Sequence, residues 1–491
     1  MKHMKKLASL LLALVMVFAL ATTAFAADTT TITAPAGSTR TYDVYQVFTG
    51  DLADGVLSNV KWGKNGTGNE GDKVSQETID ALTAVNSLSD TEKLAEISKY
   101  VKMDSEKFGT VSNGTPLTAP TGYYLIKDKG PVGDGEAYSL YVVQIVGPTT
   151  ISPKVGTVTS EKKVDDKNDS NNTQDATVWE DSADYDIGDD VPFQLKATIA
   201  QDYDNYKVYK LTFHDKESAG LTFNPDTVVV KIDGTIVDSS IYKVVTTGLT
   251  DGDTFEVRFA NLKSTAAKVG SVITVEYSST LNDQAVLGST GNPNTMHITY
   301  SNNPNDNQGG ENGKTPDDTV IVFTYKVVAN KVTKNPAYVE DGREPEYIPL
   351  KGAGFTLYKK NASGEYVAVG SEVKGGEMTT FEWRGLDDGD YKISETTTPA
   401  GYNTIADIEF TITAEHEVLS DNPTLTSLSG GDKFTGEVET GALSADIKNN
   451  KGSTLPETGG MGTTIFYVLG SVLVIGAAVL LITKKRMGAS K

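Results

Sequence analysis

Residues 391–395 read Tyr391-Lys392-Ile393-Ser394-Glu395, and this alternation indicates the fold class of the chain. Tyr391, Ile393 and Glu395 share one face of an extended segment, with polar residues between them. A period of two is typical of a β-strand that turns one face to a core and the other to water. The same pattern recurs elsewhere, in segments that include Tyr206 to Phe213, Val228 to Ile232 and Ile273 to Tyr277.

Short strands of this kind, separated by Gly, Asn and Asp, predict antiparallel β-sandwiches. A different pattern occupies Ser75 to Met103, where good helix formers carry apolar residues at helical intervals. We therefore predict a mainly all-β chain of tandem immunoglobulin-like sandwiches, with a helix or two in the first domain.

The N-terminal residues are typical of a removed secretory signal peptide. Three early lysines are followed by an apolar run from Leu7 to Ala21, and Ala24-Phe25-Ala26 places small residues where a signal peptidase reads. The apolar run is short for a membrane-spanning helix. We expect cleavage after Ala26 and export of the mature protein.

The C-terminal residues form three signals in a fixed order. Leu455-Pro456-Glu457-Thr458-Gly459 comes first, an uncharged apolar stretch runs from Ile465 to Ile482, and Lys484, Lys485 and Arg486 follow. As a helix the stretch would be about 27 Å long, close to the hydrocarbon core of a bilayer, with the basic cluster on the cytoplasmic side.

The pentapeptide resembles the LPXTG signal of sortase substrates. In that chemistry a sortase thiolate attacks the carbonyl of the threonine, here Thr458, and forms a thioester. The bond to Gly459 breaks, the apolar tail stays behind, and an amine on another molecule resolves the thioester. The expected mature protein ends at Thr458, has no membrane span, and is covalently linked to the wall of a Gram-positive cell.

Composition excludes several classes of function. The formal net charge of the chain is −21. The charged residues in the two ends that we expect to be removed are all basic, so the mature protein has a still more negative net charge. A surface of that charge argues against binding nucleic acid, which needs basic patches. The chain has no Cys, so an exported protein of this sequence must be braced by something other than disulfides.

Two stretches divide the chain. Pro148 to Pro153 ends a first segment, and Asn302 to Asp318 is rich in Asn, Gly, Pro and Asp, as is typical of an exposed connection. We predict a signal peptide at 1–26, an N-terminal domain at 27–155, a middle domain at 156–315, a third domain at 319–452, and a sorting segment at 453–491.

These segments resemble the domains of Gram-positive sortase-assembled major pilins. Thr41 to Gly50 and Leu57 to Gly63 are similar to the N-terminal pilin domain. Glu161-Lys162-Lys163-Val164 and Ile298 to Pro304 are similar to the two ends of an isopeptide-forming fimbrial domain. The third domain resembles a collagen-binding-protein B-type (CnaB) domain, on the basis of Leu350 to Tyr358, the "E-box" Tyr391 to Thr396, and Pro399 to Tyr402.

The resemblance implies an internal Lys–Asn amide in such domains, formed without an enzyme. A buried Lys loses its proton because burial disfavours charge, and the neutral amine is a nucleophile. A buried Asp or Glu stays protonated, polarises the Asn carbonyl and passes a proton to the departing ammonia. Holding the groups in contact makes an otherwise very slow reaction feasible.

Strand parity selects the residues. In the third domain Lys331 shares a face with Tyr325, and Asn449 with Ile447, so we assign Lys331, Glu395 and Asn449. In the middle domain the same argument favours Lys162, Asp215 and Asn294, with Lys163, Asn292 and Asn302 as open alternatives. No comparable set is predicted in the first domain.

Ile151-Ser152-Pro153-Lys154 resembles the pilin motif, whose usual form has Tyr-Pro-Lys, so Ser152 is a departure. The resemblance implies that the Lys154 amine attacks the sortase thioester of the next subunit. The alternative is an ordinary surface lysine at a linker. An exposed lysine has a pKa near 10, so the polymerising sortase would have to activate it.

No metal or cofactor is expected. His214, His297 and His416 are widely spaced and show no ligand spacing. Asp166, Asn168 and Ser170 alternate like the start of a calcium loop, but its sixth and twelfth positions would be Asn171 and Thr177 rather than Gly and Glu.

The predicted function is that of the repeating shaft subunit of a cell-surface pilus that supports adhesion. The alternative is a wall-anchored monomeric adhesin or a minor pilin at the tip or base. The expected partners are pilus-specific and housekeeping sortases, other copies of the chain, minor pilins, peptidoglycan, and a surface ligand of unknown identity. No enzymatic activity is expected beyond formation of the internal amides, because no catalytic motif rises above chance.

Overall fold

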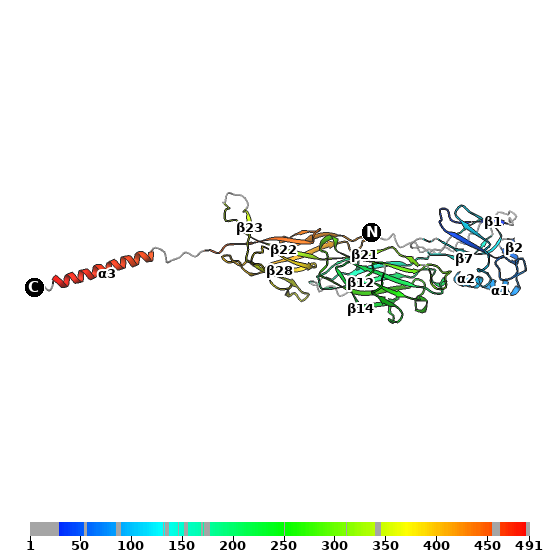
Figure 1. The fold of residues 1–491 in the computed structure, drawn as a ribbon, viewed down its shortest axis with the longest axis horizontal. Helices are drawn as coiled ribbons and strands as arrows, with labels where there is room; N and C mark the ends of the chain where they lie inside the picture. The colour runs from blue at the N-terminus through cyan, green and yellow to red at the C-terminus, as the bar shows by residue number, and fades with distance from the viewer. Residues whose placement is uncertain are drawn as a thin grey trace.

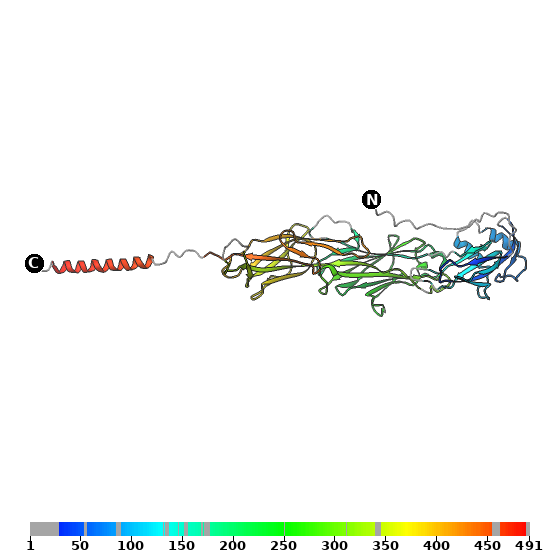
Figure 2. The ribbon, with the colours of Figure 1, turned by 90° about the horizontal axis from the view of Figure 1, so that it is seen from above.

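The computed structural model describes residues 29–53, 56–84, 90–130, 132, 137–145, 147–151, 156–167, 170, 177–249, 251–310, 312–338, 345–453 and 462–487. The chain is elongated, with three β-rich units in a row and one helix beyond the third (Figure 1). The same order is seen after a turn of 90° (Figure 2). We call residues 29–151, 156–323 and 325–453 the first, middle and third units. The predicted mainly β fold is confirmed.

The first unit combines two small sheets with two helices. One sheet has the order β3-β2-β6-β7 with β4 against β2, and the other has the order β5-β1-β8. The helices lie within the predicted segment, and their apolar residues Ile79, Leu82 and Leu94 pack against Phe48 and its neighbours. The elements are β1 (Thr29–Thr33), β2 (Thr41–Ala53), β3 (Val56–Trp62), α1 (Gln76–Ala84), α2 (Asp90–Ser98), β4 (Gly109–Ser112), β5 (Leu117–Pro120), β6 (Gly122–Asp128), β7 (Leu140–Ile145) and β8 (Thr149–Thr150).

The middle unit is a sandwich of two sheets. Their orders are β10-β9-β12-β18-β14-β15 and β11-β21-β19-β13-β17-β16, with β20 against β19. Alternate residues of the strands fill the core between the sheets, as in β12, where every second residue is buried. Among its described residues, three short 3₁₀ helices lie in the loops: η2 (Tyr203–Asn205), η3 (Leu262–Ser264) and η4 (Gly288–Thr290).

The strands of the middle unit are β9 (Thr159–Asp165), β10 (Trp179–Glu180), β11 (Ser182–Asp184), β12 (Asp190–Thr198), β13 (Leu211–Glu217), β14 (Leu221–Ile232), β15 (Thr235–Ile236), β16 (Lys243–Val245), β17 (Phe255–Phe259), β18 (Val272–Leu281), β19 (Asn292–Ser301), β20 (Asn312–Lys314) and β21 (Asp318–Phe323).

The third unit is a second sandwich, with sheets of order β23-β22-β32-β31 and β25-β24-β28-β29-β30. Its first long strand and its last strand, β22 and β32, lie side by side and run parallel. The elements are β22 (Tyr325–Lys334), β23 (Tyr347–Pro349), β24 (Gly354–Lys360), β25 (Tyr366–Ala368), β26 (Val373–Lys374), β27 (Thr380–Leu386), β28 (Gly389–Thr397), β29 (Ile408–His416), β30 (Leu425–Ser429), β31 (Thr435–Glu437) and β32 (Ala442–Asn449).

The middle and third units meet without a spacer. Strand β21 pairs with β19 and β11 of the middle unit, and only Thr324 separates it from β22. The predicted connection at 302–318 carries β20, which pairs with β19 and so belongs to the middle sheet. The domain division remains a proposal, and this pairing favours a border at Thr324 over the predicted one at 315–319.

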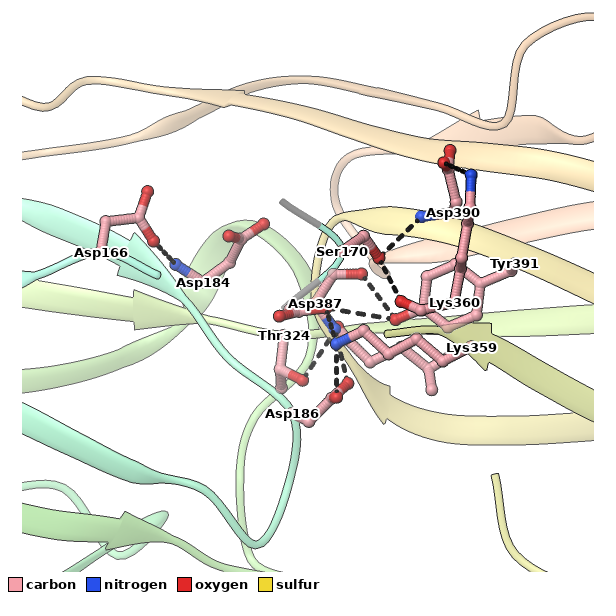
Figure 3. A network of polar contacts seen from close by, with 11 residues as sticks. Asp166, Ser170, Asp184, Asp186, Thr324, Lys359, Lys360, Asp387, Asp390 and Tyr391 are labelled. Carbon is pink, nitrogen blue, oxygen red and sulfur yellow. Dashed lines mark hydrogen bonds and ion pairs between the residues drawn. The ribbon is translucent and has the colours of Figure 1, made fainter. Parts of the chain in front are cut away.

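Polar contacts hold this junction (Figure 3). Lys359 of β24 lies 2.6 Å from Asp186 of the middle unit and 2.5 Å from Asp387 of the third. Gly288 and Gly441 approach so closely that a Cβ on either would meet backbone atoms of the other segment at about 2.5 Å, and both have positive φ. The junction therefore needs glycine at both positions.

Beyond the third unit, α3 (Gly462–Met487) lies apart from the sandwiches (Figure 1). Its residues Ile465–Met487 are long and apolar enough to cross a membrane, and Lys484, Lys485 and Arg486 lie in its last turn. This is the apolar stretch with a basic end that the sequence predicts.

Candidate crosslinking sites

The third unit brings together all three of its predicted residues. Lys331 comes from β22, Glu395 from β28 and Asn449 from β32, and all three side chains are buried. Lys331 Nζ lies 2.9 Å from Glu395 Oε1 and donates to Asn449 Oδ1 at 2.7 Å. Asn449 Nδ2 donates to Glu395 Oε1 at 3.1 Å. Amine, amide and carboxyl group are thus in mutual contact.

The register of the strands explains this meeting. In the parallel pair β22–β32, Lys331 lies opposite Ile447 and Thr333 lies opposite Asn449. Lys331 and Asn449 are therefore offset by two residues along the pair, which places them as neighbours on the same inward face. The opposite sheet supplies Glu395, whose Oε2 is fixed by the Ile405 backbone N–H at 3.0 Å. The Phe355 ring lies 5.2 Å from the Lys331 amine, measured to the ring centroid.

Burial lowers the pKa of Lys331, and the hydrogen bond and charge of Glu395 oppose that shift. A lowered pKa increases the neutral fraction of the amine, which is the nucleophilic form. Turning the Asn449 amide by half a rotation would place its oxygen on Glu395 and its nitrogen beside the lysine. That is the orientation in which the Glu395 carboxyl group can polarise the carbonyl.

In the middle unit the predicted lysine and acid are in direct contact. Lys162 Nζ of β9 lies 2.5 Å from Asp215 Oδ2 of β13, and both side chains are fully buried. Asn294 of β19 is also fully buried, but it is linked to the pair through Tyr277. The Tyr277 hydroxyl donates to Asp215 Oδ2 and accepts from both Lys162 Nζ and Asn294 Nδ2, each at 2.9 Å.

Sequence reasoning missed Tyr277 and Glu217 as members of this cluster. Glu217 lies directly opposite Asn294 in the β13–β19 register and accepts a hydrogen bond from Ser279. Parity places Tyr277 on the inward face of its strand with Ile273 and Val275, but an inward tyrosine is ordinarily a core residue. Only the tertiary contact distinguishes it.

Burial dominates the electrostatics of the middle cluster. It lowers the pKa of Lys162, while Asp215 opposes the shift. It raises the pKa of Asp215 despite the neighbouring lysine, and it raises the pKa of Glu217 to about 7, with a further contribution from Asp215. Asp215 Oδ1 and Asn294 Oδ1 are both buried without a hydrogen bond. A proton on Asp215 would supply a hydrogen-bond donor in a cluster where these acceptors lack one.

The alternatives left open in the middle domain lie elsewhere. The Lys163 amine pairs with Asp181 at 2.5 Å on the outer side of β9. The Asn292 amide bonds the backbone of Val286 and Val322. Asn302 follows the far end of β19. The geometry therefore favours Lys162 and Asn294, and the assignment stays a prediction.

The signal peptide, Lys154 with Ser152 and Pro153, and the sorting residues Leu455, Pro456, Thr458 and Gly459 lie outside the described residues. By sequence Lys154 lies between β8 and β9, and Thr458 follows β32. Both predicted linkage points therefore border the run of the middle and third units.

Three segments match known protein families. Residues 187–304 match the Gram-positive pilin backbone subunit 2, Cna-B-like domain, and residues 344–424 match a prealbumin-like fold domain. Residues 447–487 match the LPXTG cell wall anchor motif. The Cna-B-like description thus falls on the middle unit, whereas the sequence comparison above placed a B-type domain in the third. The predicted resemblance and wall anchor are confirmed.

A curated relative is the trypsin-resistant surface T6 protein of Streptococcus pyogenes, 25% identical over 342 residues that cover 55% of this chain and 60% of that protein. The chain thus spans about 60% of the relative's length. Solved structures include the T6 backbone pilin of S. pyogenes (17% identity, TM-score 0.49, covering 87% of this chain and 98% of that one). Another is the major pilin SpaD of Corynebacterium diphtheriae (17%, 0.44, 88% and 99%).

Proposed function

We propose that this chain, which carries a Gram-positive pilin backbone domain and an LPXTG wall anchor, is the repeating shaft subunit of a covalent pilus. The observation that carries the proposal is the presence of both features in one elongated molecule whose units lie in a row (Figure 1). Such a molecule can be joined end to end and then fixed to the wall.

The proposed polymer bond joins Thr458 of one subunit to Lys154 of the next. A sortase thiolate breaks the peptide bond between Thr458 and Gly459 and holds the threonine as a thioester. The Lys154 amine attacks that thioester, an amide forms, and the thiolate is released. A cell-wall amine attacking the same thioester would instead attach the chain to peptidoglycan.

The two buried clusters are proposed to form internal amides. The neutral Lys Nζ attacks the Asn side-chain carbon, a new C–N bond forms, the bond to Nδ2 breaks, and ammonia leaves with a proton relayed by Glu395 or Asp215. The contact distances around Lys331, Glu395 and Asn449 support this for the third unit. In the middle unit Tyr277 is a positioning residue. Its hydroxyl lies between the two side chains and must move aside when Lys162 Nζ reaches the Asn294 side-chain carbon.

The proposed bonds define a path for tension through the subunit. Force entering at Lys154 would cross from Lys162 to Asn294, follow the chain to Lys331, cross to Asn449 and leave at Thr458. The residues between each bonded pair would carry no load. The parallel strands β22 and β32 are pulled at opposite ends, so the amide between them would stop the strands from shearing apart.

Replacing Thr458 with Ala is expected to abolish attachment to the wall, because sortase would no longer recognise the site of thioester formation. Cell fractionation should move the protein from the wall fraction to the membrane and medium, where boiling detergent extracts it. Thr454→Ala, just outside the pentapeptide, is the matched control and should leave attachment unchanged. A Thr458→Ala protein that stays wall-linked and resists detergent would contradict the sorting proposal.

Replacing Tyr277 with Phe is expected to slow formation of the middle-unit amide by at least about tenfold, because Lys162, Asp215 and Asn294 lose the hydroxyl that joins them. Intact-mass spectrometry of freshly expressed protein should show partial loss of the corresponding ammonia. Tyr206→Phe, which removes a buried hydroxyl bonded to Asp202 in the same unit, is the control. Complete bond formation at the wild-type rate would exclude a positioning role for Tyr277.

A wall-anchored monomeric adhesin or a minor pilin remains the second candidate. It shares the LPXTG anchor but needs no acceptor lysine and no polymer. The partners proposed for the shaft subunit are a polymerising sortase, a housekeeping sortase, further copies of the chain, minor pilins and peptidoglycan.

A further inference from the structure

Three ligand-type side chains from distant parts of the sequence meet at the junction of the middle and third units. Asp166 follows β9, Asp184 ends β11 and His416 ends β29, and their ligand atoms all lie within 4.8 Å of one another. His416 Nε2 and Asp166 Oδ2 lie 3.9 Å apart. Figure 3 shows Asp166 and Asp184 beside the Lys359 contacts.

The hydrogen bonds of Ser182 determine which histidine nitrogen is free of a proton. The Ser182 hydroxyl lies 2.8 Å from His416 Nδ1 and donates to the Glu417 carbonyl at 2.9 Å. Because a hydroxyl has one hydrogen, Nδ1–H must be the donor to Ser182, and a neutral ring then carries its lone pair on Nε2. That lone pair faces the carboxylate of Asp166.

Asp184 adds a second carboxylate, one oxygen of which lacks a hydrogen bond. Its side chain is buried, and its Oδ2 has no hydrogen-bond partner. The Tyr325 hydroxyl of β22 and the Asp388 backbone N–H both interact with the Asp184 carboxylate, so it is Oδ2 alone that stays unsatisfied. The Asp184 backbone N–H does donate to Asp166 Oδ1 at 3.2 Å, which fixes the two acids relative to each other.

The surrounding charges do not neutralise this group. Lys359 is held by Asp186 and Asp387, and Lys163 is held by Asp181. Lys167 lies 3.3 Å from Asp165, while Asp388 adds a further acid near Asp184.

We propose that Asp166, Asp184 and His416 bind one divalent transition-metal cation of the Zn²⁺ class and so fasten the third unit to the middle unit. An imidazole nitrogen with two carboxylates suits Zn²⁺ and its neighbours in the first transition row, whereas Ca²⁺ takes oxygen ligands. Ligands 2.1 Å from a tetrahedral ion lie about 3.4 Å apart, so the 3.9 Å pair and the other ligand atoms, all within 4.8 Å of one another, must close around a bound ion.

The Ser182 hydroxyl fits the role of a group that orients the histidine ligand, because metal-bound histidines ordinarily donate their other N–H to a neighbour. A second acid–histidine group, His214 with Asp253 and Glu256, carries no such inference. Both of its ring nitrogens are already engaged at 2.8 Å, Nδ1 with Asp253 and Nε2 with Thr299.

The test is a titration of the chelator-treated mature protein with ZnCl₂ by isothermal calorimetry. One equivalent should bind, and zinc should raise the melting temperature. His416→Gln and Asp184→Asn should each weaken binding at least tenfold, while Asp253→Asn in the second group should not. Excess CaCl₂ should not displace the zinc, and Co²⁺ in its place should give a visible absorption band that His416→Gln removes.

Thermal melting verifies that each variant is folded. If His416→Gln or Asp184→Asn unfolds the protein, Asp166→Asn is tested in its place, because Asp166 is more exposed than His416. The same loss of zinc affinity is expected. Absence of a one-equivalent binding event in the wild type, or unchanged affinity in the folded variants, would overturn the proposal.

Discussion

The mature protein is expected to weigh less than its sequence by two ammonias, and the Glu395→Ala variant is expected to regain one of them. Glu395 contacts both Lys331 and Asn449, so its removal leaves the amine and the amide in place without the group that polarises the carbonyl and relays the proton. Asp215→Ala should regain the other ammonia by the same reasoning. Intact-mass spectrometry measures both differences.

Glu377→Ala is the matched control, because this glutamate is an exposed acid of the third unit paired with Lys351. Its mass should show the loss of two ammonias, as in the wild type. A wild-type protein with the full sequence mass would contradict both crosslinks, and a loss of one ammonia would leave a single braced unit.

Loss of the third-unit bond should also be visible in stability. A crosslink restrains the unfolded chain much as a disulfide does, so Glu395→Ala is expected to lower the free energy of unfolding by about 2–4 kcal/mol. In single-molecule pulling between the two ends, residues 332–448 should extend only in the variant. That adds about 400 Å of chain, a length that the wild type should never release.

The second large effect is expected from Lys154→Arg. Arginine keeps the positive charge but cannot supply an equivalent nucleophile to the thioester. Polymers should disappear from the wall extract, leaving monomers that remain attached through Thr458. The control is Lys163→Arg, a nearby lysine that is paired with Asp181. Polymers that persist in Lys154→Arg would place the acceptor on another lysine.

Strand alternation, together with the E-box resemblance, was sufficient to select the three third-unit residues that the structure brings into contact. Lys331, Glu395 and Asn449 each lie on a regular strand, so parity along the sequence placed all three on inward faces, and the sandwich then brought those faces together. The middle unit was harder to predict, because the contact between Lys162 and Asn294 runs through Tyr277. No local pattern separates such a tyrosine from its core neighbours.

Two other features depend on tertiary contacts that composition does not encode. The stretch 302–318 has the composition of a linker, yet β20 within it pairs with β19, and β21 continues the middle sheet. The acid–histidine group at the junction was not predicted, because a search for a calcium loop examines neighbouring residues. Asp166 of the middle unit and His416 of the third unit are instead far apart in the sequence and meet only at the junction.

The central claim is that the chain is a polymerising shaft subunit, and an immunoblot of detergent-boiled wall extract tests it most directly. We predict a ladder of high-mass species whose steps correspond to one mature chain, since the Lys154–Thr458 amides survive boiling. A single band at the mass of one wall-linked chain would contradict the account and identify a monomeric adhesin.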